Sequence, residues 1–116
     1  MTLQAYQNTQ RITEDSRSTE YRLFGQVTGA LLDVQKAGDH GSPLVEAVDW
    51  NKKLWRTLAA DCMDDRNRLP QDVRAKIVSL SLWIAKYSRQ VTRNGASLDP
   101  LIQVNRNMMQ GLKGAA

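Results

Sequence analysis

Apolar residues recur every three or four positions along most of the chain, which is the spacing of helices that bury one face. No stretch alternates apolar and polar residues as a strand does. The pattern therefore predicts an all-α fold, a single-domain antiparallel bundle of four to five helices. Its expected core consists of four stripes: Leu23, Phe24, Val27, Ala30, Leu31 and Val34; Leu44, Val48, Trp55, Leu58, Ala59 and Cys62; Val73, Ile77, Leu80, Ile84, Tyr87 and Val91; and Leu101, Val104, Met108 and Leu112.

Three prolines mark expected helix starts. Ser42-Pro43 and Asp99-Pro100 each offer an N-cap followed by a proline in the first helical position. Pro70 is a third candidate for that position. These signals predict short connections between helices.

The start of the chain has a weaker pattern. Ser18 is a candidate N-cap for a helix over residues 19–37, and residues 3–12 show only weak periodicity. We therefore expect one domain over residues 1–116, in which residues 1–17 form an N-terminal arm or a short helix.

Two helix faces carry more apolar or small residues than one core requires. Val78 and Leu82 lie opposite the core stripe of their helix. Either this helix is buried on both sides, which we favour in a domain of this size, or the patch receives a partner.

Gly25 and Gly29 lie four residues apart, beside Tyr21 and Leu32 and also opposite the core stripe. Because glycine is unfavourable inside a helix, the pair suggests that another helix backbone approaches closely there. That neighbour is either the N-terminal segment or a second chain.

Asn51 falls within an apolar stripe, so its amide needs hydrogen bonds inside the protein. We favour a bond that fixes the helix register over a polar anchor for a partner. Trp50 lies on the shoulder of the same stripe and is the tryptophan expected to remain partly exposed. Tryptophan is common at binding hot spots, so Trp50 is also a candidate contact residue.

Composition narrows the class of protein. The chain has 116 residues, 41% of them hydrophobic, with one Cys, one His and a net charge of +4. One Cys allows no intrachain disulfide, and no long apolar segment is present. We expect a soluble cytoplasmic protein that has no export signal, does not bind membranes and holds no metal or cofactor.

The excess positive charge lies in the second half of the chain. Residues 59–116 contain nine basic and five acidic side chains, whereas residues 1–58 contain seven of each. These basic residues either form a solvated helix face, which we favour, or bind RNA or an acidic partner. The candidates are Arg66, Arg68, Arg74, Lys76, Lys86, Arg89 and Arg93.

No catalytic constellation is visible in the sequence. The one histidine, His40, lies in a polar turn flanked by glycines, where we expect it to face solvent. Phosphate-binding and dinucleotide-binding glycine motifs are absent. We expect no enzymatic activity and no small-molecule substrate.

Several ordered blocks of the sequence resemble the FlaF family of bacterial flagellar biosynthesis regulators. The resemblance extends from about Tyr6 to Leu112, and the connector over residues 36–42 matches least well. The blocks are residues 19–28 (TEYRLFGQVT), 49–55 (DWNKKLW), 58–62 (LAADC), 69–70 (LP), 77–84 (IVSLSLWI), 100–106 (PLIQVNR) and 109–112 (MQGL).

The resemblance implies a cytoplasmic factor for flagellin production that binds flagellin as a secretion chaperone. It also implies a partner, the translational regulator FlbT, and no catalysis. Capture of an amphipathic flagellin helix in a groove would suit such a role. Helical geometry offers Tyr21, Gly25, Gly29, Leu32, Trp50, Val78 and Leu82 as contacts. The alternative is regulation of flagellin mRNA, either directly through the basic helix or through FlbT.

Overall fold

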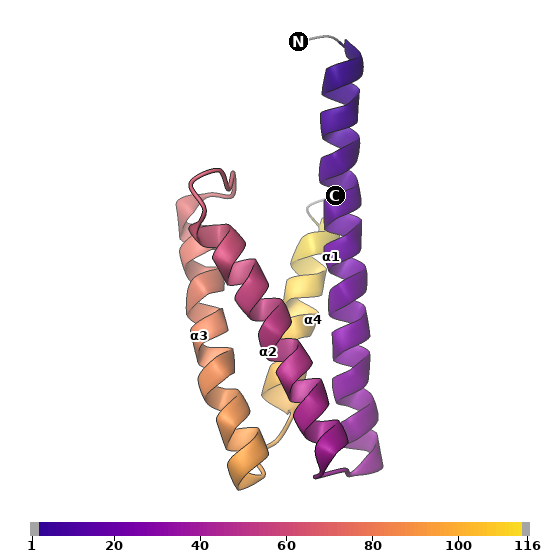
Figure 1. Cartoon of the computed structure of the whole chain (residues 1–116), viewed down its shortest axis with the longest axis vertical. Helices are drawn as coiled ribbons and strands as arrows, with labels where there is room; N and C mark the ends of the chain where they lie inside the picture. Colours follow the sequence, from indigo (N-terminus) through magenta and orange to yellow (C-terminus); the bar gives the residue numbers. More distant parts are fainter. Residues whose placement is uncertain (1–2, 115–116) are drawn as a thin grey trace.

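The computed structural model describes the backbone of residues 3–114 and the side chains of residues 18–112. In this part of the chain there are four helices and no strand, which confirms the all-α class. The helices are α1 (Leu3–Ala37), α2 (Ser42–Met63), α3 (Gln71–Asn94) and α4 (Asp99–Gly114). Each helix runs roughly opposite to the one before it (Figure 1).

The first helix differs from the prediction. The expected helix start at Ser18 is wrong, because α1 begins at Leu3 and continues through Ser18 without a break. The backbone of residues 3–17 is therefore the first part of α1, and their side chains lie outside the described residues. No Gly or Pro occurs before Gly25, and the polar residues near Ser18 cost a helix interior only a fraction of a kcal/mol each.

The other three helices start within one residue of the predicted positions. Ser42 is the first residue of α2 instead of its N-cap, which is Gly41, and Pro43 lies in the first turn. Pro70 is the N-cap of α3 instead of its first residue. The helix α4 begins at Asp99.

Two glycines end helices in the left-handed conformation. Gly38 follows α1 with φ 63°, and Gly95 follows α3 with φ 70°. The next amide then bonds back to the helix, from Asp39 to the Val34 carbonyl at 3.2 Å and from Ala96 to the Gln90 carbonyl at 3.2 Å. These caps permit short turns into α2 and α4.

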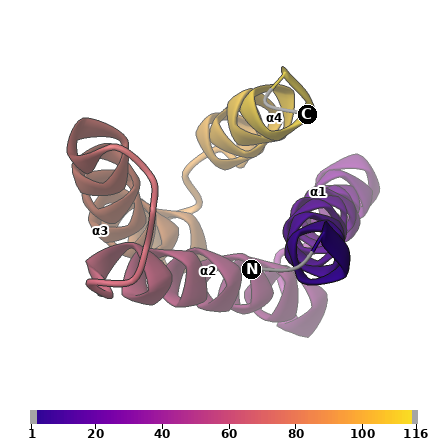
Figure 2. The ribbon, with the colours of Figure 1, turned by 90° about the horizontal axis from the view of Figure 1, so that it is seen from above.

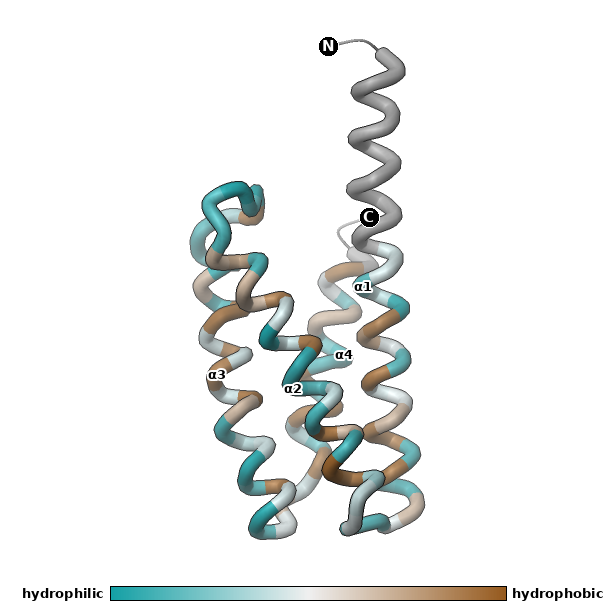
Figure 3. Tube along the Cα trace, viewed as in Figure 1, coloured by the Kyte–Doolittle hydropathy of each residue, from teal (hydrophilic) through white to brown (hydrophobic). Residues whose placement is uncertain are grey.

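The helix α2 lies between α1 and α3, whereas α4 packs mainly along α1 (Figure 2). Apolar positions recur along the coloured part of every helix (Figure 3), and the predicted stripe of α2 is buried throughout. Phe24 and Trp55 meet edge to face at the centre, with ring centroids 5.5 Å apart. The remaining largest buried apolar side chains are Leu31, Ile84, Leu101, Val27 and Val48.

Candidate functional site

Among the side chains that the structure describes, each helix contributes one polar side chain to the core: Thr28, Asn51, Ser88 and Asn105. Asn105 of α4 is the centre of the hydrogen bonding. It accepts a bond from Trp55 Nε1 at 2.8 Å and donates to Asn51 Oδ1 at 2.8 Å and to Thr28 Oγ1 at 3.2 Å. The bond predicted for Asn51 therefore exists, and it joins α2 to α4.

The Gly25 face of α1 is occupied within the chain. A Cβ atom on Gly25 would lie 3.6 Å from Met109 Cε of α4. Farther along α1, Thr28 bonds to Asn105 and Gln35 Nε2 donates to Asp99 Oδ1 at 2.7 Å, both in α4. Within the chain, the neighbour at Gly25 is therefore α4 and not the N-terminal segment.

Gly29 makes no close contact within the chain. No neighbouring atom comes within 4 Å of a Cβ built there, so no helix of the described chain makes the contact predicted at Gly29, and a contact with a second chain stays a prediction. Leu32 is half-buried and packs against the core, and Tyr21 remains exposed.

Val78 and Leu82 differ in how much of each side chain is exposed. Val78 is half-buried against the core, whereas Leu82 is 69% exposed. The favoured burial of both sides of this helix is therefore wrong at Leu82, because only the flank that bears Val78 reaches the core. Trp50 is 41% exposed, as expected from its shoulder position.

The apolar stripe predicted for α3 divides into two halves. Ile77, Ile84 and Val91 are buried. Val73 is 38% exposed, and Leu80 and Tyr87 are only half-buried. The prediction that Val73 belongs to the core is therefore wrong.

Trp83 is also 38% exposed and stacks on Tyr87, with ring centroids 5.1 Å apart. We call Val73, Leu80, Trp83 and Tyr87 the α3 strip.

The α3 strip lies on the side of α3 that turns toward α4. Tyr87 Oη donates to the carbonyl of Ser97, just before α4, at 2.6 Å. Val104 and Met108 are half-buried on the side of α4 away from the Met109 that contacts α1. Figure 2 shows α3 and α4 apart from each other, with no other helix between them.

The predicted basic surface is not one patch. Arg74 donates from Nε to the Cys62 carbonyl at 2.7 Å and from Nη2 to the Asp64 carbonyl at 3.1 Å. Arg66 pairs with Asp64 at 2.9 Å. The other five basic residues, Arg68, Lys76, Lys86, Arg89 and Arg93, are exposed and form no ion pair with any described side chain.

The pKa values of three groups are shifted at the α2–α3 corner: those of the Arg66 guanidinium and the Cys62 thiol are raised, and that of the Asp64 carboxyl is lowered. Side-chain hydrogen bonds from Arg66, helped by its backbone amide, lower the pKa of the Asp64 carboxyl. Burial raises the pKa of the Cys62 thiol above its ordinary value, so the thiol stays protonated at neutral pH. Cys62 is thus a small apolar residue of the core, as the stripe predicted.

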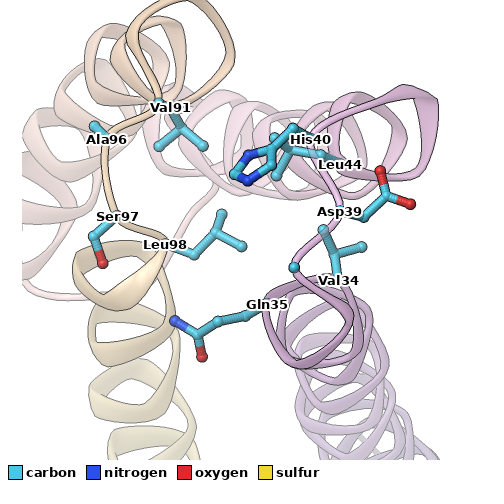
Figure 4. A pocket seen from close by; sticks show the side chains of 11 residues that line it. Val34, Gln35, Asp39, His40, Leu44, Val91, Ala96, Ser97 and Leu98 are labelled. Carbon is cyan, nitrogen blue, oxygen red and sulfur yellow. The ribbon is translucent and has the colours of Figure 1, made fainter.

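A shallow pocket of about 180 Å³ lies where the α1–α2 and α3–α4 loops meet. His40 is exposed, as predicted, and its ring turns toward this pocket, whereas the Asp39 carboxylate turns away (Figure 4). Asp39 Oδ1 accepts the Gly41 amide, and Ser97 Oγ accepts the Asp99 amide. The Asp39 and Ser97 side chains stabilise the turns and form no nucleophile–base pair with His40.

No cluster of potential metal ligands occurs among the residues that the structure describes. Within the same residues no helix has the length and apolar character required to cross a bilayer. Searches of curated proteins and of solved structures found no match. The family model of the flagellar protein FlaF matches residues 2–112. Because this match covers nearly the whole sequence, the chain belongs to the FlaF family of flagellar proteins.

Proposed function

We propose that this protein is a cytoplasmic regulator of flagellum biogenesis that binds newly made flagellin as a secretion chaperone. The family match over residues 2–112 is the observation that carries the proposal. In this role the protein supports flagellin synthesis and export. It needs no catalysis, metal or cofactor.

The mechanism is capture of a helix. Flagellin's terminal segments are amphipathic and have no partners before assembly, so an all-α protein with spare apolar surface can cover them. Exposed apolar side chains on α3 support this mechanism, namely Val73, Leu82 and Trp83. Covering the segments would keep flagellin monomeric until export.

The direct test mixes the purified protein with monomeric flagellin. We expect a complex in size-exclusion chromatography and slower polymerisation of flagellin by light scattering. Flagellin that lacks its terminal helices is the matched control and should not bind. If intact flagellin forms no complex and polymerises at its usual rate, the proposal is wrong.

A second candidate function is post-transcriptional control of flagellin mRNA. It is supported by Lys86, Arg89 and Arg93, which lie within about 60° of one another around α3 and form no ion pair with a described side chain. Direct control predicts binding to the flagellin leader RNA that weakens steeply with salt and with reversal of these three charges. Control through FlbT instead predicts that FlbT, and no RNA, binds the purified protein.

A further inference from the structure

We propose that the α3 strip, together with Val104 and Met108 of α4, is the docking surface for one amphipathic helix whose polar face is acidic. This surface deepens the flagellin-binding function proposed above and rests on it for the identity of the protein that supplies the helix. It differs from the surfaces around Gly25, Leu82 and Trp50.

The spacing of the α3 strip is that of a helix–helix seam. Val73, Leu80 and Tyr87 lie seven residues apart, and Trp83 follows Leu80 by three. Such a heptad pattern is typical of a face that packs against another helix. At 1.5 Å per residue, the strip is about 21 Å long and matches about four helical turns of a partner.

The helices of the described chain cover this seam only in part: Leu80 and Tyr87 are half-buried against the core, whereas Val73 and Trp83 are exposed. The partner of α3 is α2, which packs against its other half at Ile77, Ile84 and Val91. The helix α4 packs mainly along α1, so it leaves Trp83 and Val73 exposed. An added helix beside α3 would cover both residues and the facing side of α4.

The aromatic part of the surface is held in place before binding. Trp83 and Tyr87 stack with their rings inclined by only 13°. The bond from Tyr87 Oη to the Ser97 carbonyl fixes the second ring. A rigid aromatic surface loses little conformational entropy when a partner docks, which favours binding.

The charges beside the strip select the partner. Lys76 occupies the position seven residues before Trp83, and Lys86 lies on the outer flank. Both are exposed and form no ion pair with a described side chain. Asp72 is the one acidic residue in α3, against five basic residues. Acidic residues along the flank of the docked helix would complement this excess.

The test titrates two designed 18-residue peptides into the full-length protein. Both carry the same leucine heptad stripe, and one has glutamates and the other lysines on its polar face. We expect the glutamate peptide to bind, and Trp83→Ala to weaken its binding about tenfold. Trp50→Ala is the matched control, because this tryptophan is similarly exposed on another helix, and it should leave binding unchanged.

Two further variants separate shape from charge. Val73→Asp should weaken binding as Trp83→Ala does, and circular dichroism checks that each variant remains folded. Lys76→Glu should weaken the glutamate peptide several-fold, whereas Lys36→Glu at the end of α1 should not. Absence of glutamate-peptide binding, equal binding of the lysine peptide, or an equal loss in Trp50→Ala would overturn the proposal.

The same variants also show whether something other than an acidic amphipathic helix covers the α3 strip. If the protein self-associates and Trp83→Ala makes it monomeric, the surface joins two copies of the chain and the proposal is overturned. If flagellin binds both wild type and Trp83→Ala equally, the chaperone function stands and this docking surface is wrong. If the glutamate peptide binds at the strip but flagellin does not bind, the surface stands and the chaperone function is wrong.

Discussion

At the scale of single residues, Asn105 links three helices through one side chain. Its amide oxygen receives the Trp55 ring N–H, and its amide nitrogen donates to Asn51 and Thr28. All four side chains are buried. Buried polar groups that lose a partner are costly, so this cluster restricts how α4 can sit against α1 and α2.

Replacing Asn105 should therefore destabilise the protein strongly. We expect Asn105→Ala to lower the free energy of unfolding by about 2–4 kcal/mol, because it leaves Trp55 Nε1 without its acceptor and opens a cavity. Urea unfolding followed by tryptophan fluorescence measures this change. Asn107→Ala, in the same helix but exposed, should change the value by less than about 0.5 kcal/mol; equal losses in both variants would contradict this role.

Sequence reasoning identified Asn51 but missed its partner Asn105. Asn51 lies within a long stripe of buried residues, so its burial could be predicted. In the shorter α4 the predicted stripe is Leu101, Val104, Met108 and Leu112. Leu101 is buried as predicted, but the other three are half-buried, whereas Ile102 and Asn105 are buried. Four turns of helix leave the centre of an apolar face poorly defined, and only packing against α1 and α2 fixed it.

At the scale of elements, α1 contains two glycines with different surroundings. Gly25 contacts α4, whereas a Cβ on Gly29 would meet no neighbouring atom within 4 Å. Neither residue has a positive φ, unlike Gly38 at the end of the helix. Within the chain, the glycine pair therefore does not form one helix-contact motif, although its spacing suggests one.

Gly29→Ala should stabilise the protein by about 0.5–1 kcal/mol, because alanine favours the helix and fits the open space. Thermal and urea unfolding measure the gain. Gly38→Ala is the control with the opposite sign, since its φ of 63° strains any side chain and should cost about 1 kcal/mol. A loss of stability in Gly29→Ala would show that an unseen close contact exists there.

The third helix shows what the spacing of apolar residues can and cannot predict about burial. Its stripe of six apolar residues predicted one buried face, and the structure divides it into a buried half and the partly exposed α3 strip. Periodicity reports which residues share a face. It cannot report how wide a face the neighbours cover, because that width depends on where α4 docks.

At the scale of the whole molecule, the chain is elongated. Its radius of gyration is 16.0 Å, whereas a compact chain of this length has about 13 Å. The longest dimension is 55 Å, close to the roughly 52 Å expected for the 35-residue α1. The arrangement of α1, α2 and α4 around Trp55 nevertheless makes each of these helices necessary for the core.

A chain that ends at Gly95 lacks α4 and should lose its fixed tertiary structure. The buried side chains of Leu101, Ile102 and Asn105 would be absent, so the core would open around Trp55, whose Nε1 bonds to Asn105. We expect loss of the near-ultraviolet circular dichroism signal and of cooperative unfolding, while much helical signal remains. Adding a peptide of residues 97–114 should restore the near-ultraviolet signal; a truncated chain that unfolds cooperatively without the peptide would contradict this expectation.

The sequence by itself determined the all-α class, the starts of three helices, the α2 core stripe and the family, because these depend on local periodicity, proline positions and residue order. It did not determine that α1 is continuous. The polar residues near Ser18 suggest a helix start, but each costs only a fraction of a kcal/mol inside a helix. Only the tertiary structure decided that α4 occupies the Gly25 face, that Asn105 joins three helices and that the α3 strip remains partly uncovered. The physical reason is that contacts between residues distant in the chain select which of several apolar faces becomes buried.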